Sequence, residues 1–217
     1  MEEVHTSLIF LAWMAPVAYL LGSLPTAVWT GRIFHGIDVR MHGSGNAGAT
    51  NVMRVLGVKT GVPVLLVDML KGWAAVSLLK IQPDVEKGEE LFMILSIALG
   101  ILAVIGHIFP VLAGFRGGKG VATISGVCFA LHPAATAAAL GIFILALLLT
   151  KYVSVGSISA GITFPVWVIL VFRSPYISLW IFSIVAAILL IITHRKNIIR
   201  LKNGQENKAY FLFGNKK

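Results

Sequence analysis

The segment with the clearest chemical potential is GSGNAGATNVMR, residues 43–54, a polar, glycine-rich stretch between two strongly apolar ones. Because glycine has no Cβ, backbone N–H groups beside it can approach an oxygen-rich ligand closely. Amide, hydroxyl and guanidinium groups in the same stretch would complete a phosphate-binding site. The candidate phosphate ligands are Gly43, Gly45, Asn46, Thr50, Asn51 and Arg54, with Ser44 among them. A flexible polar loop is the alternative interpretation.

A second glycine-rich segment, RGGKG at residues 116–120, places a lysine ammonium among exposed backbone N–H groups. It makes Gly117, Gly118, Lys119 and Gly120 further candidates for phosphate binding. Neither segment fits a nucleotide-binding signature. GSGNAG does not follow a strand in a βαβ unit, and RGGKG lacks the first glycine and the final Ser or Thr of a Walker A loop. A basic turn at a membrane surface is the alternative for RGGKG.

A membrane protein must position these segments, because the chain is too apolar for a soluble domain of its size. Of its 217 residues, 57% are hydrophobic and only 12% are charged. The net charge of +9 comes from short basic segments flanking apolar ones, where it sets topology and meets anionic lipid, so we expect no nucleic-acid binding. The single cysteine, Cys128, excludes a disulfide framework. His35, Asp38 and His42 lie in a charged loop, and we expect neither a metal nor a cofactor.

The apolar segments are long enough to cross a bilayer, which takes about 20 helical residues. They cover residues 7–29, 61–79, 91–114, 121–150, 152–172 and 176–193. His132-Pro133 interrupts 121–150, which is therefore one kinked helix or two short ones.

Charge distribution chooses between these two alternatives. Two crossings put fourteen lysines and arginines on one side of the membrane and three on the other, whereas one crossing gives seven and ten. We therefore predict an all-α bundle of seven transmembrane helices forming a single domain, residues 1–217. Its N-terminus is expected outside, with the two glycine-rich segments and the C-terminal tail in the cytoplasm.

Two ionisable residues lie three apart inside the apolar segment 61–79, where charge is costly unless it is paired or faces a polar cavity. They are Asp68 and Lys71, and a functional site and a structural ion pair are equally open. We count Lys71 as a candidate phosphate ligand and Asp68 as a supporting residue. His107, near the end of the next apolar segment, is a second supporting residue, although a lone histidine there is more often a packing residue.

In the tail, His194, Asn197 and Arg200 recur at every third position where the last apolar segment ends. On a helix this spacing places the three side chains within one arc, so they can face one site. A solvated interfacial helix would explain the neighbouring basic residues, but a neutral histidine and an asparagine on one side are less typical of that role.

Taken together, these segments resemble one family, the integral-membrane glycerol-3-phosphate acyltransferases that use acyl-phosphate as the donor. Its first motif is similar to GSGNAGATNVMR, with GSLPTA before it and VDMLKG after it. Its second is similar to GHIFPVLAGFRGGKGVAT, residues 106–123, and its third to HRKNIIRLKNGQE, residues 194–206. Arg116 departs from the lysine expected before GGKG but keeps its charge. The HxxxxD signature of acyl-CoA-dependent acyltransferases is missing here, as it is in that family.

The resemblance implies transfer of a fatty acyl group to the 1-hydroxyl of sn-glycerol 3-phosphate in a bacterial inner membrane, giving lysophosphatidic acid and phosphate. It places Ser44 in the first motif and His194 with Asn197 in the third, and we assign these three to catalysis. Arg200 is assigned to phosphate binding and Glu206 to support. We expect a monomer in contact with membrane lipid. A transporter of organic phosphates is the alternative class, but the sequence contains no internal repeat.

The predicted topology can be tested by cysteine labelling. In a Cys128→Ala background, single cysteines at Ser44 and Lys202 should resist an impermeant thiol reagent added to intact cells, because both positions are predicted to be cytoplasmic. A cysteine at Arg173, predicted to lie outside, is the positive control. Labelling of either cytoplasmic position from outside would overturn the topology.

Overall fold

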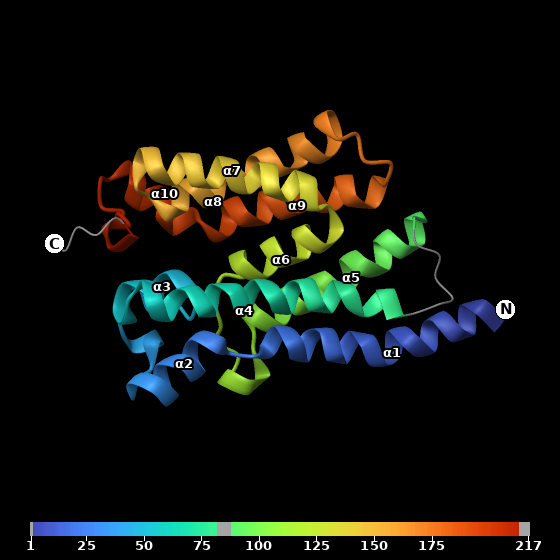
Figure 1. Ribbon diagram of the computed structural model, residues 1–217, viewed down its shortest axis with the longest axis horizontal. Helices are drawn as coiled ribbons and strands as arrows, with labels where there is room; N and C mark the ends of the chain where they lie inside the picture. Colours follow the sequence, from blue (N-terminus) through green and yellow to red (C-terminus); the bar gives the residue numbers. More distant parts are fainter. Residues whose placement is uncertain (1, 82–87, 213–217) are drawn as a thin grey trace. The chain divides into compact units, whose positions relative to one another are not determined.

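The computed structural model describes residues 2–81 and 88–212, and every regular element in that part of the chain is a helix (Figure 1). The α-helices are α1 (Glu2–Ser23), α2 (Thr26–His35), α3 (Ala49–Leu56), α4 (Val58–Ser77), α5 (Glu90–Ile108), α6 (Val121–Leu131), α7 (Pro133–Thr150), α8 (Val153–Val166), α9 (Ile177–Thr193) and α10 (Arg195–Lys202). Shorter turns are η1 (Val39–Met41), η2 (Leu78–Ile81), η3 (Val111–Ala113), the π-helix η4 (Trp167–Val171) and η5 (Tyr210–Leu212). The all-α prediction is confirmed for the described residues.

The chain divides into two compact units, Met1–Leu131 and His132–Lys217. The first unit contains α1 to α6 and the second contains α7 to α10. The boundary falls at His132-Pro133, the dipeptide that interrupts the longest apolar segment. The prediction of a single domain stays a prediction.

The break at this boundary has a clear local cause. Pro133 occupies the first turn of α7, where its missing N–H costs nothing. His132 caps the helix, since its Nδ1 accepts a hydrogen bond from the N–H of Ala135 at 3.2 Å. Residues 121–150 are therefore two helices, as the charge distribution favoured.

Helices occur at all seven predicted crossings, but they differ in length. Among the described residues, four helical stretches are long and apolar enough to span a bilayer: Val58–Ile81, Glu90–Ala113, Pro133–Thr150 and Val153–Val171. A fifth is obtained if α9 and α10, which are bent by 55° relative to each other, count as one span. Helix α6 has only eleven residues. The number of seven crossings and the sidedness of the termini stay predictions.

The predicted span 7–29 includes the end of one helix and the start of another. Helix α1 ends at Ser23 and α2 begins at Thr26, so the helix is interrupted at Leu24-Pro25. Proline restricts the residue before it to extended conformations, which is why the interruption falls there. Helix α2 then leads to the first glycine-rich segment.

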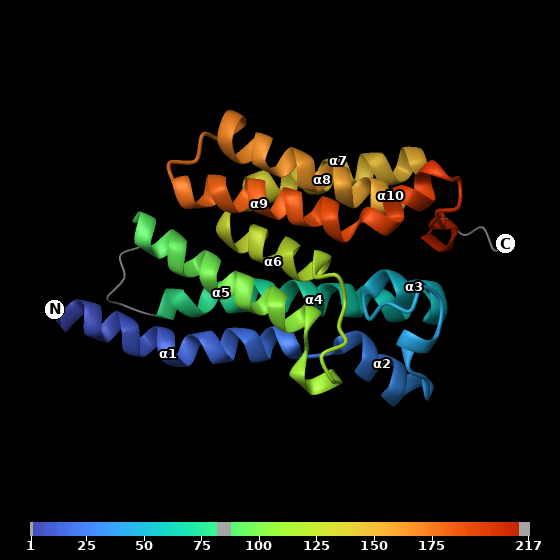
Figure 2. The same ribbon diagram turned by 180° about the vertical axis from the view of Figure 1, so that it is seen from behind.

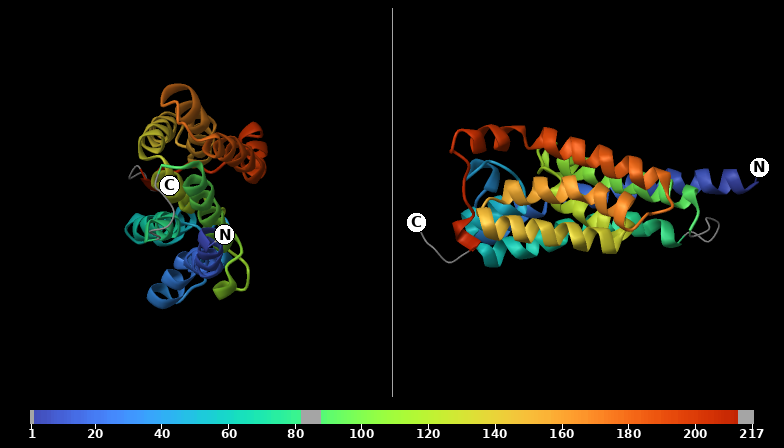
Figure 3. Two further views of the ribbon diagram at one scale, coloured as in Figure 1. Left: turned by 90° about the vertical axis from the view of Figure 1, so that its right-hand side faces the viewer. Right: turned by 90° about the horizontal axis from the view of Figure 1, so that it is seen from above.

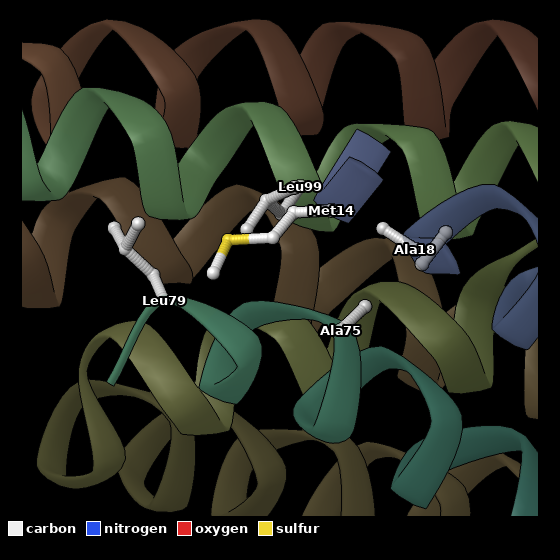
Figure 4. Packing of buried hydrophobic residues seen from close by; sticks show 6 residues of the cluster. Met14, Ala18, Ala75, Leu79 and Leu99 are labelled. Carbon is white, nitrogen blue, oxygen red and sulfur yellow. The ribbon is translucent and has the colours of Figure 1, made fainter. Parts of the chain in front are cut away.

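In the first unit, α1, α4 and α5 lie lengthwise beside one another (Figure 2). They enclose a buried apolar cluster in which alanines alternate with larger side chains, as Figure 4 shows for five of its members. The cluster consists of Met14, Ala18, Ala75, Leu79, Leu99 and Ala103. Pairing of small and large side chains allows close packing without voids.

Helix α6 is held against α4 at two glycines. Gly72 of α4 faces the backbone carbonyl of Thr123, and Gly126 of α6 faces that of Met69. A Cβ at either glycine would overlap the opposing carbonyl oxygen, so the two helices meet backbone to backbone. Small residues commonly join helices in membranes, because lipid supplies little hydrophobic drive for helix association. These contacts fix the start of α6, which directly follows RGGKG.

In the second unit, α8 packs against α7 and α9 (Figure 3). Gly156 of α8 leaves room for the ring of Phe143 on α7, and Gly161 leaves room for Leu190 on α9. After α10, the chain returns to the end of α7, where the N–H of Ala209 donates to the carbonyl of Lys151 at 2.7 Å. This return places Glu206 beside Asn197 and Arg200 of the same motif.

The glycine contact between α4 and α6 gives a stability prediction. Gly126→Ala should lower the free energy of unfolding by about 1–3 kcal/mol, because the added methyl group has to displace the Met69 carbonyl. Gly141→Ala is the matched control, since a Cβ there meets nothing within 4 Å. Alanine favours a helix over glycine by about 1 kcal/mol, so the control should be neutral or stabilising. Equal melting temperatures of the two variants in detergent would contradict the backbone contact.

Candidate active site

The buried ion pair between Asp68 and Lys71 lies at the interruption between α1 and α2. Lys71 Nζ is 2.8 Å from Asp68 Oδ1 and donates a second hydrogen bond to the carbonyl of Leu24 at 3.0 Å. The hydroxyl of Thr26 donates to the same Asp68 oxygen at 2.5 Å. Asp68 and Lys71 are only 1% and 4% exposed. The lysine predicted to bind phosphate therefore has its ammonium group engaged inside the protein.

The charges of Lys71 and Asp68 lie where they interact favourably with the dipoles of α1 and α2. The ammonium of Lys71 binds a carbonyl just past the end of α1, where the helix dipole is negative. The carboxylate of Asp68 binds Thr26 at the start of α2, where the dipole is positive. The pair thereby stabilises the interruption that Pro25 creates. Sequence reasoning found the pair but did not predict this contact.

Asn51 organises the first glycine-rich loop from inside. Its Oδ1 accepts hydrogen bonds from the N–H of Ser44 at 2.8 Å and from the Ser44 hydroxyl at 3.1 Å. Its Nδ2 donates to the carbonyls of Val39 at 2.9 Å and His42 at 3.1 Å. All four hydrogen-bonding positions of this amide are used, and the residue is 2% exposed. Asn51 is therefore a scaffold of the loop instead of the predicted phosphate ligand.

The other predicted site residues of the first glycine-rich segment differ from Asn51 in their exposure and backbone conformation. Gly43 and Gly45 have φ values of +61° and +72°, which suit glycine, and a Cβ on Gly43 would overlap the Asn51 amide. The Ser44 side chain is exposed and donates its proton to Asn51, so its oxygen is left to accept a hydrogen bond from a substrate. Asn46 precedes α3. Thr50 and Arg54 lie on α3, and both are partly exposed.

Asp38 and Arg40 connect the first glycine-rich loop to the second. Arg40 Nη1 donates to the carbonyls of Ala113 at 2.9 Å and Arg116 at 3.3 Å, while its Nη2 lies 2.7 Å from Asp38 Oδ2. The hydrogen bond from Arg40 holds the pKa of the Asp38 carboxyl well below its ordinary value of 3.8, against the effect of burial. The same bond raises the pKa of Arg40. Arg40 was not among the predicted site residues, and its position two residues after Asp38 was the available signal.

In the second loop, two backbone N–H groups predicted to bind phosphate are already engaged. The N–H of Gly117 donates to the carbonyl of Ile108 at 3.1 Å, and that of Gly118 donates to the carbonyl of His107 at 3.2 Å. These bonds cap the end of α5. Neither glycine has room for a Cβ, because it would overlap the His107 carbonyl or the His107 ring. The two glycines therefore fit the loop against α5.

The remaining donors of the second loop lie at the start of α6. Gly120 has a φ of +78°, and its carbonyl accepts from the N–H of Ile124 at 2.8 Å, so the helix begins directly after it. The first N–H groups of a helix lack partners within that helix and attract anions. Lys119 immediately precedes this turn. The arrangement suits a phosphate group at Lys119 and the first turn of α6.

A small cavity of about 10 Å³ lies behind the second loop. It is lined by the buried polar residues Asp68, Lys71 and His107 and by residues of both loops, among them Ala47 and Gly118. Its volume is about what one water molecule needs. The cavity therefore lies where the Asp68–Lys71 pair meets both glycine-rich loops.

The third motif forms a cluster around Glu206 in the second unit. Asn197 Nδ2 donates to Glu206 Oε1 at 2.7 Å, and Arg200 Nε donates to Oε2 at 2.7 Å. The hydroxyl of Ser154 on α8 donates to Oε1 at 2.9 Å. Arg200, predicted to bind phosphate, thus shares its charge with a carboxylate. Asn197 is oriented by the hydrogen bond from its amide nitrogen to Glu206.

His194 lies at the junction of α9 and α10 and is 4% exposed. Its Nδ1 is 2.9 Å from the carbonyl of Leu190. A carbonyl can only accept, so Nδ1 carries the proton and Nε2 has the lone pair in the neutral ring. The group that orients the ring is a backbone carbonyl and not the carboxylate of a catalytic triad.

The described residues contain no group of three or more His, Cys, Asp or Glu side chains arranged to hold a metal ion. His35 instead lies near Thr60, with Nε2 3.4 Å from its hydroxyl oxygen, and Asp38 binds two arginines. These two members of the loop set considered for a metal therefore have other partners.

Comparison with known proteins identifies the class. The family model described as Glycerol-3-phosphate acyltransferase matches residues 12–204. A Glycerol-3-phosphate acyltransferase of Chlorobaculum parvum is 43% identical to this chain, covering 94% of it and 98% of the relative. One from Salinibacter ruber is 41% identical, covering 88% and 89%. The chain therefore belongs to the glycerol-3-phosphate acyltransferase family, and the predicted family is confirmed.

Solved structures agree. The chain is similar to PlsY (YgiH), an integral membrane glycerol 3-phosphate acyltransferase, in its glycerol 3-phosphate form, with a TM-score of 0.78 and 36% identity over 91% of this chain and 94% of that one. The lysophosphatidic acid form gives a TM-score of 0.77 and 35% identity over 93% and 98%. This protein is therefore a multi-pass membrane protein of the acyltransferase class.

The Glu206 cluster gives a pH prediction. Burial acts to raise the pKa of the Glu206 carboxyl, but hydrogen bonds from Arg200, Asn197 and Ser154 outweigh it and hold the pKa below its ordinary value of 4.5. A group with a lowered pKa in the folded state stabilises the fold above its ordinary pKa, and this stability is lost as the pH falls below that value.

We therefore expect the melting temperature of the wild type to fall between pH 6 and roughly pH 3 by more than that of Glu206→Gln, because the variant has no carboxylate to protonate. Glu89→Gln, at an exposed position, is the control and should behave like the wild type. Identical pH dependence in wild type and Glu206→Gln would contradict the assignment.

Proposed function

We propose that this protein transfers a fatty acyl group from acyl-phosphate to the 1-hydroxyl of sn-glycerol 3-phosphate, giving lysophosphatidic acid and phosphate. The observation that carries the proposal is the likeness, over more than nine-tenths of the chain, to a structure in a glycerol 3-phosphate form and one in a lysophosphatidic acid form. The acyl-phosphate donor is inferred from the similarity of the three motifs to the family described above. We place the reaction on the cytoplasmic side of a bacterial inner membrane and expect a monomer without a cofactor.

Phosphate chemistry supports this proposal. Both substrates carry a phosphate group, and each glycine-rich loop is followed by a helix: Lys119 directly precedes α6, and Arg54 lies in the last turn of α3. The positive end of a helix and a nearby cation stabilise a phosphate together. We assign phosphate binding to these two residues together with Gly43, Gly45, Asn46, Thr50 and Gly120. The other candidates then support the loops from inside the protein, namely Gly117, Gly118 and Lys71.

The reaction itself needs little covalent chemistry from the protein. The hydroxyl oxygen of glycerol 3-phosphate forms a bond to the acyl carbonyl carbon, the bond from that carbon to the phosphate oxygen breaks, and the hydroxyl proton passes to the departing phosphate. The donor is already activated, so positioning and charge neutralisation can supply most of the catalysis. No acyl group is transferred to Ser44 in this scheme.

Ser44, His194 and Asn197 are proposed to place the substrates by hydrogen bonds. The Ser44 oxygen and His194 Nε2 are acceptors, given that their neighbouring protons go to Asn51 and Leu190. A backbone carbonyl stabilises an imidazolium less than a carboxylate does. We therefore assign the proton to the phosphate oxygen of the donor and a positional role to His194.

The reaction is tested with purified protein in detergent, acyl-phosphate and glycerol 3-phosphate. We expect phosphate and lysophosphatidic acid to appear in equal amounts, and only when both substrates are present. Acyl-CoA in place of acyl-phosphate is the matched control for the donor. Product formation from acyl-CoA in place of acyl-phosphate, or phosphate release without glycerol 3-phosphate, would overturn the proposed reaction.

The proton assignment is tested with His194→Gln. A general base typically contributes about 10²- to 10⁴-fold, so a positional histidine should leave more than about a hundredth of kcat and an unshifted pH profile. A larger loss together with a lost titration near neutral pH would make His194 the base. Acylated Ser44 trapped on rapid quench would rule out direct transfer.

A further inference from the structure

Lys71, Asp68 and His107 form a chain of buried polar side chains that ends at the second glycine-rich loop. His107 Nδ1 lies 3.7 Å from Asp68 Oδ1, the oxygen that also receives Lys71 and Thr26. The side chains of Lys71, Asp68 and His107 belong to residues that are 4%, 1% and 6% exposed. They lie on α4 and α5, and the proposed reaction assigns them no step.

The opposite edge of the His107 ring faces Gly118. A Cβ built on Gly118 would overlap His107 Nε2 and would come within 3.1 Å of the Ala47 carbonyl in the first loop. Backbone bonds from Gly117 to Ile108 and from Gly118 to His107 run along the same surface. His107 therefore touches the loop with both its ring and its carbonyl, and the ring has Asp68 on its other side.

This geometry fixes where the loop can lie. Losing a partner is costly for a buried polar group, which favours the contacts of Asp68 Oδ1 with Lys71 and Thr26. The His107 ring therefore lies between Asp68, 3.7 Å from Nδ1, and the backbone of Gly118. Arg40 binds the carbonyl of Arg116 at the start of the loop and that of Ala113 in η3 just before it.

We propose that His107, held by the Asp68–Lys71 pair, is a positioning residue that sets the place of the loop Arg116–Gly120 and thereby the affinity for glycerol 3-phosphate. The inference rests on the proposed function only in taking glycerol 3-phosphate as the ligand of this loop. Its effect should appear in the binding of that substrate and not in the binding of the acyl donor.

Two variants separate positioning from stability. His107→Phe keeps a ring of similar size against Gly118 but has no nitrogen toward Asp68. The double variant Asp68→Asn/Lys71→Met removes both charges together, so neither is left buried and unpaired, and the amide oxygen introduced at position 68 can still accept from Thr26. Ser96→Ala is the matched control, since Ser96 is a 2% exposed polar residue of the same helix as His107, α5.

The first measurement is the KM for each substrate and the kcat of the purified variants. Misplacing a binding group by about 1 Å can cost up to about a hundredfold, so we expect His107→Phe and the double variant to raise the KM for glycerol 3-phosphate about tenfold or more. The KM for acyl-phosphate should stay within about twofold, as should both values for Ser96→Ala. Unchanged KM values, or a loss confined to kcat, would overturn the inference, because a merely structural role lowers the amount of active enzyme.

The second measurement does not depend on turnover. Glycerol 3-phosphate should raise the melting temperature of the wild type and of Ser96→Ala at the same concentration, and the two test variants should need about tenfold more. If the wild type shows this shift and the variants lose it while no acyl transfer occurs, the proposed reaction fails and the inference stands. Equal half-saturating concentrations in all four proteins would overturn the inference, even if acyl transfer occurs as proposed.

Discussion

A charge inside an apolar helix has to be neutralised within the protein, and the pair of Asp68 and Lys71 meets this constraint at the point where the first membrane helix is interrupted. Both side chains are almost completely buried, and breaking such a pair typically costs about 3–5 kcal/mol, so the pair is held in one arrangement. Because that arrangement includes Leu24 and Thr26, α4 fixes the angle at which the chain leaves α1 toward the first loop. The same carboxylate faces His107, so the start of α2 and the end of α5 both contact one buried group.

Each of the three motifs is held in place by a polar residue that faces the protein instead of a substrate. Asn51 does so in the first loop with four hydrogen bonds, and Glu206 does so in the third motif with three. Arg40 does so between the two glycine-rich loops through the carbonyls of Ala113 and Arg116. Satisfied networks of this kind fix side chains and backbone in one conformation, which a site that works mainly by positioning requires. Because the donor in the proposed reaction is already activated, positioning is the main contribution that the protein has to make.

Much of the class could be predicted from sequence because its causes are local. Composition and the length of the apolar segments determine a helical membrane protein, and Pro133 after His132 determines a break between two helices. Motif spacing was enough to identify the acyltransferase family, which the family model and the relatives confirm. Glycine at positions such as Gly120 follows from its positive φ, which other residues rarely adopt. The seven crossings and the orientation still depend on charge counting alone.

The partners of the polar residues, in contrast, were decided only by the tertiary structure. Residue type predicted that Asn51, Lys71, Gly117 and Gly118 could bind phosphate, and that chemistry is correct for each group. Their hydrogen bonds instead go to Ser44, Leu24, Ile108 and His107, which are brought close by packing between segments of the chain. A donor or acceptor group can satisfy itself equally well inside the protein or on a ligand, and its type does not distinguish the two. The sequence by itself therefore determined which groups are available for phosphate chemistry, and the packing of the helices and loops against one another decided which of them support the site.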